Sequence, residues 1–358
     1  MRNKIALFLC MLVVSVGIVG CGKEGATISG EEVETGTSSE YVEQSVEVET
    51  VQSTEANTEV IDSTVPEESV IEVVEGPATV YMTSEISSES LMKIYEALGA
   101  DPQGNIAVKL SVGEPNSNYL KTDLIGELVQ SLDATIVECN TIYGGSRGNT
   151  AMHMEVAKDH GYTDIADVDI MDADDSISLP VTGGTYLEEN LVGSHFKNYD
   201  YFVVLSHFKG HEMGGFGGAI KNISIGIASR DGKFNIHTAG GTIGTWSGGD
   251  KFLASMAEAG KSVVDALDGH ILYINVMNRL SVDCDCNPSP HEPDMHDIGI
   301  LASFDPVALD QACVDLVYAA EDGEALIKRI EAKNGTYTLE HAVEIGLGTR
   351  EYTIENID

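Results

Sequence analysis

Basic residues are scarce in this sequence of 358 residues: 20 lysines and arginines stand against 58 aspartates and glutamates, a formal net charge of −38 at pH 7. Residues 78–358 alone still hold 43 acidic and 17 basic residues. Binding to nucleic acid requires a basic face that contacts phosphates, so we expect no nucleic-acid partner. A basic side chain inside a motif of this chain therefore stands out against an acidic background.

Aromatic residues are nearly absent from residues 22–77, which contain one tyrosine and neither phenylalanine nor tryptophan. The same stretch holds fifteen acidic residues and a single lysine. Such a segment buries too little apolar surface to offset its ordering entropy, and its like charges repel one another. We expect these residues to form a disordered acidic linker.

The apolar run at the start of the chain, Ile5 to Val19, is shorter than the ~20 residues of a membrane-spanning helix. It follows two positive charges, as in a signal peptide. The next residues, Ile18-Val19-Gly20-Cys21, resemble the lipobox of bacterial lipoproteins. This resemblance implies cleavage after residue 20 and acylation of Cys21, with the lipid bilayer at the outer face of the cell membrane as partner. The alternative is an uncleaved anchor helix, and either places the domain outside the cytoplasm.

Cysteine is sparse, with residues at positions 10, 21, 139, 284, 286 and 313. The first leaves with the signal peptide and the second carries the lipid, so four remain. Oxidised cysteines are common in exported proteins, and a disulfide between Cys139 and Cys313 is one alternative for them.

The motif Asp283-Cys284-Asp285-Cys286 is a compact set of potential metal ligands. One residue separates the two cysteines, a spacing that we expect to strain a mutual disulfide and to favour joint metal ligation. Two thiolates with one or two imidazoles suit zinc or iron, whereas two cysteines alone cannot hold a cubane cluster. Buried thiols or half of a disulfide are the alternative reading of this pair.

Apolar segments rich in valine and isoleucine alternate with helical patterns along residues 78–358, which we expect to form a single domain. The expected strands are Asn105–Val112, Ala134–Cys139, Tyr201–Ser206, Ile271–Met277 and Ile298–Ser303, and the expected helices are Lys121–Leu132, Thr150–His160, Gly218–Ala228 and one from Pro306. Continuous apolar strands separated by helices indicate a mostly parallel sheet covered on both faces. The predicted fold class is α/β.

Unusual side chains follow several of the expected strands, in the loops Gly144–Arg147, His207–His211, Asp283–Cys286 and Asp305–Pro306. In open α/β sheets, ligands bind outside the carboxyl ends of the strands. We therefore expect these four loops to converge on one site.

The segment Ser206–Asn222 contains four glycines, Gly214, Gly215, Gly217 and Gly218, which let the backbone approach a ligand closely. They lead into an apparent helix whose first N–H groups are available to an anion. Lys221 lies in that first turn, where a cation opposes the helix dipole, so an anionic ligand or a covalent adduct is a reason for its position. The alternative is that the glycines permit helix packing and that Lys221 extends to solvent.

Three histidines surround this segment, His207, His211 and His237, and are candidates for metal ligation or proton transfer. We interpret His291 and His296 as intermediate cases and the others as structural, namely His153, His160, His195, His270 and His341.

The sequence Asp305-Pro306-Val-Ala-Leu-Asp310 predicts a helix start with Asp305 as N-cap and Pro306 at the first position. Asp310 and Cys313 then share one helix face. A catalytic role for Asp310 is a hypothesis.

Several of these elements occur in the order typical of the domain-of-unknown-function family 362: Lys209-Gly-His211, Lys221-Asn222, Gly226, His237 and Asp305–Asp310. The resemblance extends from about residue 80 to residue 358. Members are often described as iron–sulfur centre proteins, and some carry a four-cysteine run. This chain departs from that run, since it has Cys284-x-Cys286 only.

A weaker resemblance is to the N-terminal domain of nickel-pincer lactate racemases. His211, Lys221 and His237 fall at the intervals of the racemase histidine, the lysine that carries the pyridinium cofactor and the nickel-binding histidine. Ile220 replaces the arginine before that lysine, and the Thr-His-Arg general-base segment corresponds to Gly145-Ser146-Arg147. The resemblance implies a nucleotide-derived pincer cofactor on Lys221.

The leading hypothesis is a metal-dependent redox or isomerase-like site whose Lys221 anchors an anionic small molecule or cofactor. The metal would be iron, zinc or nickel, or an iron–sulfur cluster. The candidate catalytic residues are Lys221, His211 and Asp310; the candidate metal ligands are His207, His211, His237, Cys284 and Cys286; and the candidate cofactor-binding residues are Lys209, Gly214, Gly215, Gly217, Gly218, Lys221, Asn222, Ser146 and Arg147. The rival is a non-catalytic receptor that captures an anion through residues 214–221, and a purely structural lipoprotein fits these reactive loops poorly.

Overall fold

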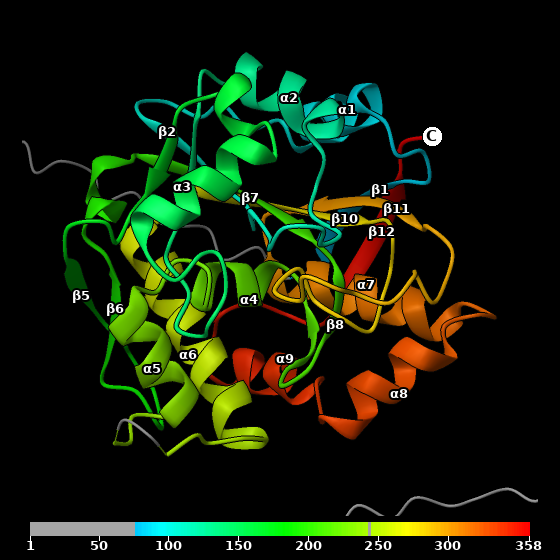
Figure 1. Cartoon of the computed structure of the whole chain (residues 1–358). Coiled ribbons are helices and arrows are strands. Elements are labelled where there is room, and N and C mark those ends of the chain that lie inside the picture. Colours follow the sequence, from blue (N-terminus) through cyan, green and yellow to red (C-terminus); the bar gives the residue numbers. More distant parts are fainter. Residues whose placement is uncertain (1–75, 243–244) are drawn as a thin grey trace, which may run out of the picture. The chain divides into compact units, whose positions relative to one another are not determined.

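The computed structural model describes residues 76–242 and 245–358 (Figure 1). The predicted signal peptide, Cys21 and the linker up to residue 75 lie outside the described residues. Among the described helices, none combines the length and apolar character that crossing a membrane requires.

An eight-stranded sheet forms the centre of residues 76–358, in the order β12-β1-β11-β10-β7-β2-β3-β4. Five of the seven neighbouring pairs are parallel, which confirms the predicted α/β class with a mostly parallel sheet. The strands are β1 (Ala78–Thr83), β2 (Ile106–Lys109), β3 (Thr135–Glu138), β4 (Val168–Ile170), β7 (Tyr201–His207), β10 (Ile271–Met277), β11 (Gly299–Ser303) and β12 (Tyr352–Asn356).

One strand runs against the other seven. β11 is antiparallel to both of its neighbours, β1 and β10. Its carboxyl end therefore lies at the opposite edge of the sheet from the ends of β2, β3 and β7. The expectation that the Asp305–Pro306 loop joins the other three loops was wrong for this reason.

Helices cover both faces of the sheet (Figure 1). Alternate residues of the strands point to opposite sides, so that Val203 and Leu205 belong to one buried cluster while Phe202 and Val204 belong to the other. The first cluster packs against α1 (Ser88–Leu98), α2 (Thr122–Ser131) and α3 (Thr150–Asp159), and the second against α4 (Ala219–Ser224) and α7 (Pro306–Ala319), with α6 (Asp250–Leu267) and α9 (Tyr337–Glu344) packed beside them.

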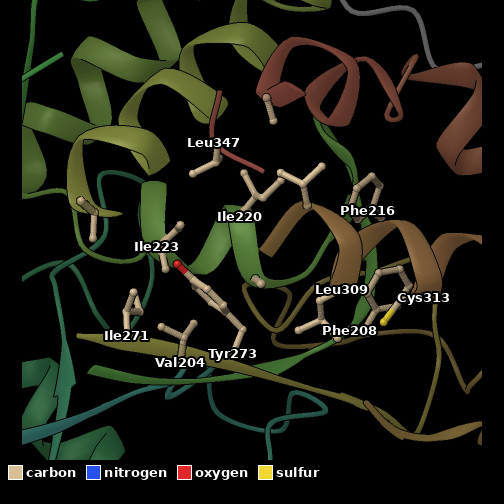
Figure 2. Close-up of a cluster of buried hydrophobic side chains, with 14 of the residues drawn as sticks. Val204, Phe208, Phe216, Ile220, Ile223, Ile271, Tyr273, Leu309, Cys313 and Leu347 are labelled. Carbon is tan, nitrogen blue, oxygen red and sulfur yellow. The ribbon is translucent and has the colours of Figure 1, made fainter. Parts of the chain in front are cut away.

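Helix α4 is short but deeply anchored, as Figure 2 shows. Ile220 and Ile223 lie three positions apart, and both belong to the buried cluster that contains Val204 and Tyr273 of the sheet, with Ile220 on the side of α4 toward Leu347. Both isoleucines are almost completely buried, and each such side chain contributes roughly 1.5–3 kcal/mol. This packing leaves Lys221, one of the two residues between them, on a different face of the helix.

Two hairpins complete the described structure, together with 3-10 helices at Tyr162–Asp164 and Ser194–Asn198. β5 (Ser176–Pro180) pairs with β6 (Glu189–Gly193), and β8 (Lys209–His211) pairs with β9 (Gly215–Gly217). The second hairpin replaces the simple loop that we expected before α4. It turns the chain from the end of β7 back over the sheet edge, and α5 (Arg230–Thr238) follows α4 while α8 (Glu324–Ala332) packs on the hairpin.

Candidate functional site

A pocket of about 400 Å³ opens at the carboxyl ends of β2, β3 and β7. Arg147, the His207–His211 segment and the Cys284–Cys286 segment all line it, so these three loops converge as predicted. Three acidic residues contribute to the lining, Glu138, Glu212 and Asp285, against five basic ones: Lys109, Arg147, Lys209, Lys221 and Lys233. The strongly acidic chain therefore encloses a pocket with an excess of positive charge.

Glu138, the last residue of β3, holds two of the five cations. Its carboxylate lies 3.2 Å from Lys109 Nζ and 3.3 Å from Arg147 Nη1, and it also accepts the N–H groups of Val112 and Cys139. Burial alone would raise the pKa of Glu138, but Lys109 and Arg147 outweigh it and hold the pKa at about 2. Glu138, Lys109 and Arg147 therefore form a buried charge network in which each group has a partner.

Arg147 is occupied on every side. Its Nε lies 3.1 Å from Glu114 Oε1, and its Nη2 donates to the Tyr143 hydroxyl at 2.7 Å. Ser146 donates its backbone N–H to the same Glu114 carboxylate and does not line the pocket. Arg147 thus forms part of the wall, and the structure does not place the Ser146 side chain at the site.

Asp285 neutralises a second pair of cationic groups. Lys209 Nζ lies 2.7 Å from Asp285 Oδ2, and His207 Nδ1 lies 2.9 Å from Asp285 Oδ1. Burial opposes ionisation of Asp285, but Lys209 and His207 hold the pKa of this carboxyl well below its ordinary value. His207 Nε2 lies 2.7 Å from the Asn278 carbonyl, so both ring nitrogens of this predicted metal ligand have partners within the protein.

Asn222 has a positioning role at the pocket floor. Its Oδ1 accepts from Lys109 Nζ at 2.9 Å, and its Nδ2 donates to Ser206 Oγ at 3.0 Å and to the Lys109 carbonyl at 3.2 Å. A Cβ on Gly226 would lie 2.1 Å from the Asn222 carbonyl oxygen and 2.7 Å from Lys109 Nζ, so that position accommodates glycine only. Asn222 therefore ties α4 to β2 and β7.

Asp310 lies behind α4, outside the pocket. Its buried carboxylate accepts the N–H groups of Ala219 at 2.7 Å and Ile220 at 3.0 Å, and the amide of Asn275 at 2.8 Å. Burial raises the pKa of Asp310 to about 6 against these three hydrogen bonds. The catalytic role expected for Asp310 was wrong: because β11 is reversed, α7 brings this carboxylate to the start of α4, where it occupies the N–H groups that we expected to bind an external anion.

The four glycines divide into two functions. Gly217 and Gly218 line the pocket, and a Cβ on Gly218 would lie 2.2 Å from Asp310 Oδ1. Gly214 and Gly215 do not face the pocket. Gly214 donates its N–H to His211 Nδ1, while Gly215, at a φ of +80°, lets the hairpin approach α8. The ligand-contact role expected for this second pair was therefore wrong.

Lys221 differs from the other four cations of the pocket because its amine has neither a carboxylate partner nor a hydrogen-bond acceptor among the described residues. Its aliphatic side chain passes over Gly217, where an added Cβ would lie 3.0 Å from Lys221 Cδ, and it lines the pocket. Within residues 76–242 and 245–358, no hydrogen bond or ion pair involves its amine. Burial lowers the pKa of Lys221 to about 7, and the nearby charge of Lys209 acts in the same direction. The amine is thus both an available cation and, above pH 7, an available nucleophile.

His211 and His237 line the same pocket with opposite tautomers. Gly214 donates its N–H to His211 Nδ1 at 2.8 Å, so the proton of this neutral ring is on Nε2. His237 Nδ1 lies 2.7 Å from the Lys233 carbonyl, an acceptor, so this ring carries its proton on Nδ1 and an electron pair on Nε2. Burial lowers the pKa of both, to about 4 for His237 and well below the usual value for His211. Near neutral pH, one ring donates and the other accepts.

Cys284 and Cys286 form a disulfide with each other, with their Cα atoms 5.3 Å apart. The structure joins the two cysteines to each other, where metal ligation was the favoured prediction, and their Cα separation falls within the 4.4–6.8 Å range of disulfides. Cys139 and Cys313 are free, buried thiols, so they are not paired with each other. A ring nitrogen of His211 and both sulfurs lie within 4.8 Å of one another, a grouping able to hold a metal ion once the sulfurs are reduced.

Sequence reasoning missed Lys109, Glu138 and Lys233. The first two are charged residues that end otherwise apolar strands, Ile106–Lys109 and Thr135–Glu138, and a charge inside a buried strand is a signal of a paired site. Lys233 sits in α5 with no comparable signal; its Nζ donates to the Ala228 carbonyl and makes no ion pair in the described part of the chain.

Two solved structures resemble this one at low similarity. The lactate racemase apoprotein of Thermoanaerobacterium thermosaccharolyticum is 12% identical, with 68% of this chain and 57% of that chain covered and a TM-score of 0.42. A protein from Thermotoga maritima is 14% identical, with 72% and 58% covered and a TM-score of 0.36. This chain thus spans less than two thirds of either.

Among curated proteins, no significant match to this sequence was found. The family described as "Domain of unknown function (DUF362)" matches residues 106–315, which include the whole of the pocket lining. The chain belongs to the DUF362 family.

Proposed function

We propose that this protein is a metal-dependent enzyme that acts on an anionic small molecule held by Lys221, with isomerase-like proton transfer as the reaction class. The observation that carries the proposal is the Lys221 amine, which lines the pocket of this acidic protein and makes no hydrogen bond or ion pair within residues 76–242 and 245–358. A partly buried cation without a partner loses part of its solvation, and an anionic ligand offsets that loss. A neutral amine with a pKa of about 7 also suits a covalently attached cofactor.

His237 fits the role of a metal ligand. A metal-binding histidine almost always donates its other ring N–H to a carbonyl or a carboxylate, which fixes the tautomer. The bond from His237 Nδ1 to the Lys233 carbonyl has this geometry, and the low pKa keeps Nε2 unprotonated. An imidazole suits nickel, zinc and iron equally, so the metal is one of these. The metal would act as a Lewis acid beside the bound anion.

His211 supplies the complementary group. Its Nε2–H can donate a hydrogen bond or a proton to a ligand in the pocket, while Gly214 keeps Nδ1 in the accepting form. A donor positioned in this way can act as a general acid toward a bound substrate. An iron–sulfur cluster is not part of the proposal, since two cysteines joined to each other offer no thiolates.

The test uses full-length protein purified without oxygen. We expect about one equivalent of nickel, zinc or iron by elemental analysis, and at least a tenfold loss in His237→Gln but not in the exposed control His270→Gln. Isothermal titration with inorganic phosphate and with small hydroxycarboxylates should show binding that Lys221→Met weakens about tenfold or more. Lys251→Met, on the exposed start of α6, is the matched control.

Two outcomes contradict this proposal. Metal-free protein that binds these anions as tightly as metal-loaded protein would favour a non-catalytic receptor. Unchanged anion affinity in Lys221→Met would remove the anchor itself.

We further propose that the protein is an exported lipoprotein anchored through Cys21. The support is the lipobox-like ending of the first apolar run. Detergent phase separation and intact mass should show acyl groups on Cys21, and Cys21→Ala should abolish both. A Cys21→Ala protein that remains processed and bound to membranes would overturn this part.

A further inference from the structure

The Cys284–Cys286 disulfide belongs to the pocket wall. Both of its residues line the pocket, with Cys284 7% exposed and Cys286 more open. A ring nitrogen of His211 lies within 4.8 Å of both sulfurs. Cys139 also borders the pocket, but its thiol donates to the Ile227 carbonyl, and Cys313 is a fully buried residue of α7 outside the pocket. A ligand in the pocket therefore meets a disulfide, and the one thiol that lines the pocket among the described residues, Cys139, is hydrogen-bonded to the backbone.

This disulfide contributes little to the fold. It closes a loop with a single intervening residue, and the stabilisation from restricting the unfolded chain is smallest for the shortest loops. The intervening Asp285 is already fixed by Lys209 and His207, and its carbonyl accepts the Glu114 N–H at 2.7 Å. These contacts already fix the loop, so the disulfide is not needed to hold its conformation.

The charges around the disulfide favour thiol–disulfide exchange with an anion. Lys221 lacks a carboxylate partner in the same pocket, so it can hold a negatively charged group beside the sulfurs. The positive charges of Lys221, Lys209 and Arg329 all act on His211, the neighbour of the sulfur pair. Positive surroundings stabilise a thiolate and so accelerate its departure from a disulfide.

We propose that Cys284 and Cys286 form a reactive disulfide that exchanges with small thiols bearing a carboxylate or phosphate group. The inference rests on the anion-binding part of the proposed function, with Lys221 as the anchor. It adds a chemical class of ligand, the anionic thiols, that neither the metal nor the proton-transfer chemistry requires.

The exchange is balanced without an external oxidant. The thiolate of the bound ligand attacks Sγ of the more exposed Cys286, the Cys284–Cys286 bond breaks, and a ligand–Cys286 mixed disulfide forms. Cys284 leaves as a thiolate, near the neutral His211 and the surrounding cations. A second ligand thiolate then attacks the ligand sulfur, giving a ligand disulfide and the Cys286 thiolate. Two thiols are oxidised and one protein disulfide is reduced; the reverse reaction with a ligand disulfide reoxidises the pair.

The experiment compares three thiols of similar size on the full-length oxidised protein: 3-mercaptopropionate, 2-mercaptoethanol and cysteamine. Peptide mass spectrometry after acid quenching and alkylation measures the mixed disulfide at Cys286. Each rate is divided by the rate of the same thiol with a neutral small-molecule disulfide, which removes differences in intrinsic reactivity. We expect a preference for the anionic thiol of about tenfold or more, and its loss in Lys221→Met with Lys251→Met unchanged. Cys286→Ser should form no adduct at that position, and Cys313→Ser should react like the parent.

Equal normalised rates for the three thiols, or an anionic preference that survives Lys221→Met, would overturn the proposal. So would a disulfide that stays intact in all three. Propionate separates this failure from that of the proposed function, because it carries the same charge without sulfur. Propionate binding that depends on Lys221 in a protein whose disulfide does not react sinks the exchange alone; absence of that binding sinks both.

Discussion

The pocket contains two kinds of cation, and they differ in what surrounds them. Lys109 and Arg147 face Glu138 at 3.2 and 3.3 Å, and Arg147 also faces Glu114 at 3.1 Å, so two carboxylates balance the two cations inside the protein. Lys221 and Lys233 make no ion pair among the described residues, although they line the same space. Removing one partner of a buried ion pair leaves the other charge uncompensated, whereas removing an unpaired charge leaves none. The first group therefore builds the pocket, and the second is available to a ligand.

The two groups also come from different parts of the fold. The paired cations lie on and beside the central strands, where β2 and β3 place Lys109 and Glu138 next to each other. The unpaired cations lie on α4 and α5, helices of six and nine residues held by side-chain contacts. The pocket thus has a neutral side formed by the central strands and a charged side formed by α4 and α5. The charged side depends on side-chain contacts such as those of Asp310.

The largest effect should come from breaking the paired group. Glu138→Gln removes the shared carboxylate of Lys109 and Arg147 and leaves both cations buried, so we expect a loss of about 3–5 kcal/mol in the free energy of unfolding. Urea denaturation measures this, with exposed Glu355→Gln of β12 as the control. A loss below about 1 kcal/mol would mean that the paired group does not support the fold.

Acid should act on the same group. The pKa of Glu138 is about 2 in the folded protein and lies near 4.5 when unfolded, so its carboxylate stabilises the fold fully above pH 4.5 and progressively less as pH falls toward 2. The shift corresponds to about 3 kcal/mol. Melting temperatures of the parent between pH 5 and pH 2 should fall more steeply than those of Glu138→Gln; parallel curves would argue against this assignment.

A smaller loss is expected at the support of the unpaired group. Asp310→Asn keeps one acceptor for the Ala219 and Ile220 N–H groups and turns a donor toward the other, which costs about 1–3 kcal/mol. Asp123→Asn, an exposed acid in the first turn of α2, is the control and should change stability by less than about 1 kcal/mol. If the two variants unfold alike, Asp310 does not hold α4.

Removing the unpaired charge should not destabilise the protein near neutral pH. The folded pKa of Lys221 is about 7 and the unfolded one 10.5, so in the parent the unfolded state binds an extra proton between these values. The parent should therefore gain about 1.4 kcal/mol of stability per pH unit above pH 7 from this group. Lys221→Met should lack that slope, and Lys251→Met should keep it. Identical slopes from pH 7 to pH 9 would show that Lys221 is paired or solvated after all.

The sheet was predictable where the signal is local. β10 matches the expected Ile271–Met277, and β7 extends the expected strand by one residue, because buried parallel strands read as continuous apolar runs. The direction of β11 was not predictable, since an apolar run has no polarity of its own and Gly299–Ser303 satisfies either orientation. That single reversal moved Asp305 and Asp310 away from the expected site.

The candidate site divides in the same way. Lys221, His211 and His237 were found because they surround a conspicuous glycine-rich segment, and all three line the pocket. The partners that occupy the other charged and N–H groups were not found, because they are distant in the sequence. Glu138 contacts Lys109 across 29 positions, and Asp310 contacts Ala219 across 91. Availability of a side chain depends on such distant contacts, and one sequence contains no local record of them.

The shared direction of all strands except β11 has a practical consequence for attaching groups to the protein. Since the other seven strands share one direction, β1 begins at the edge of the sheet opposite the pocket, whereas β12 ends at the pocket edge. A solid support, fluorophore or fusion partner joined just before Ala78 would leave the pocket entrance clear. The same group joined after Asp358, whose carboxylate accepts hydrogen bonds from Thr83 and Ser84, would lie on the same edge of the sheet as the pocket.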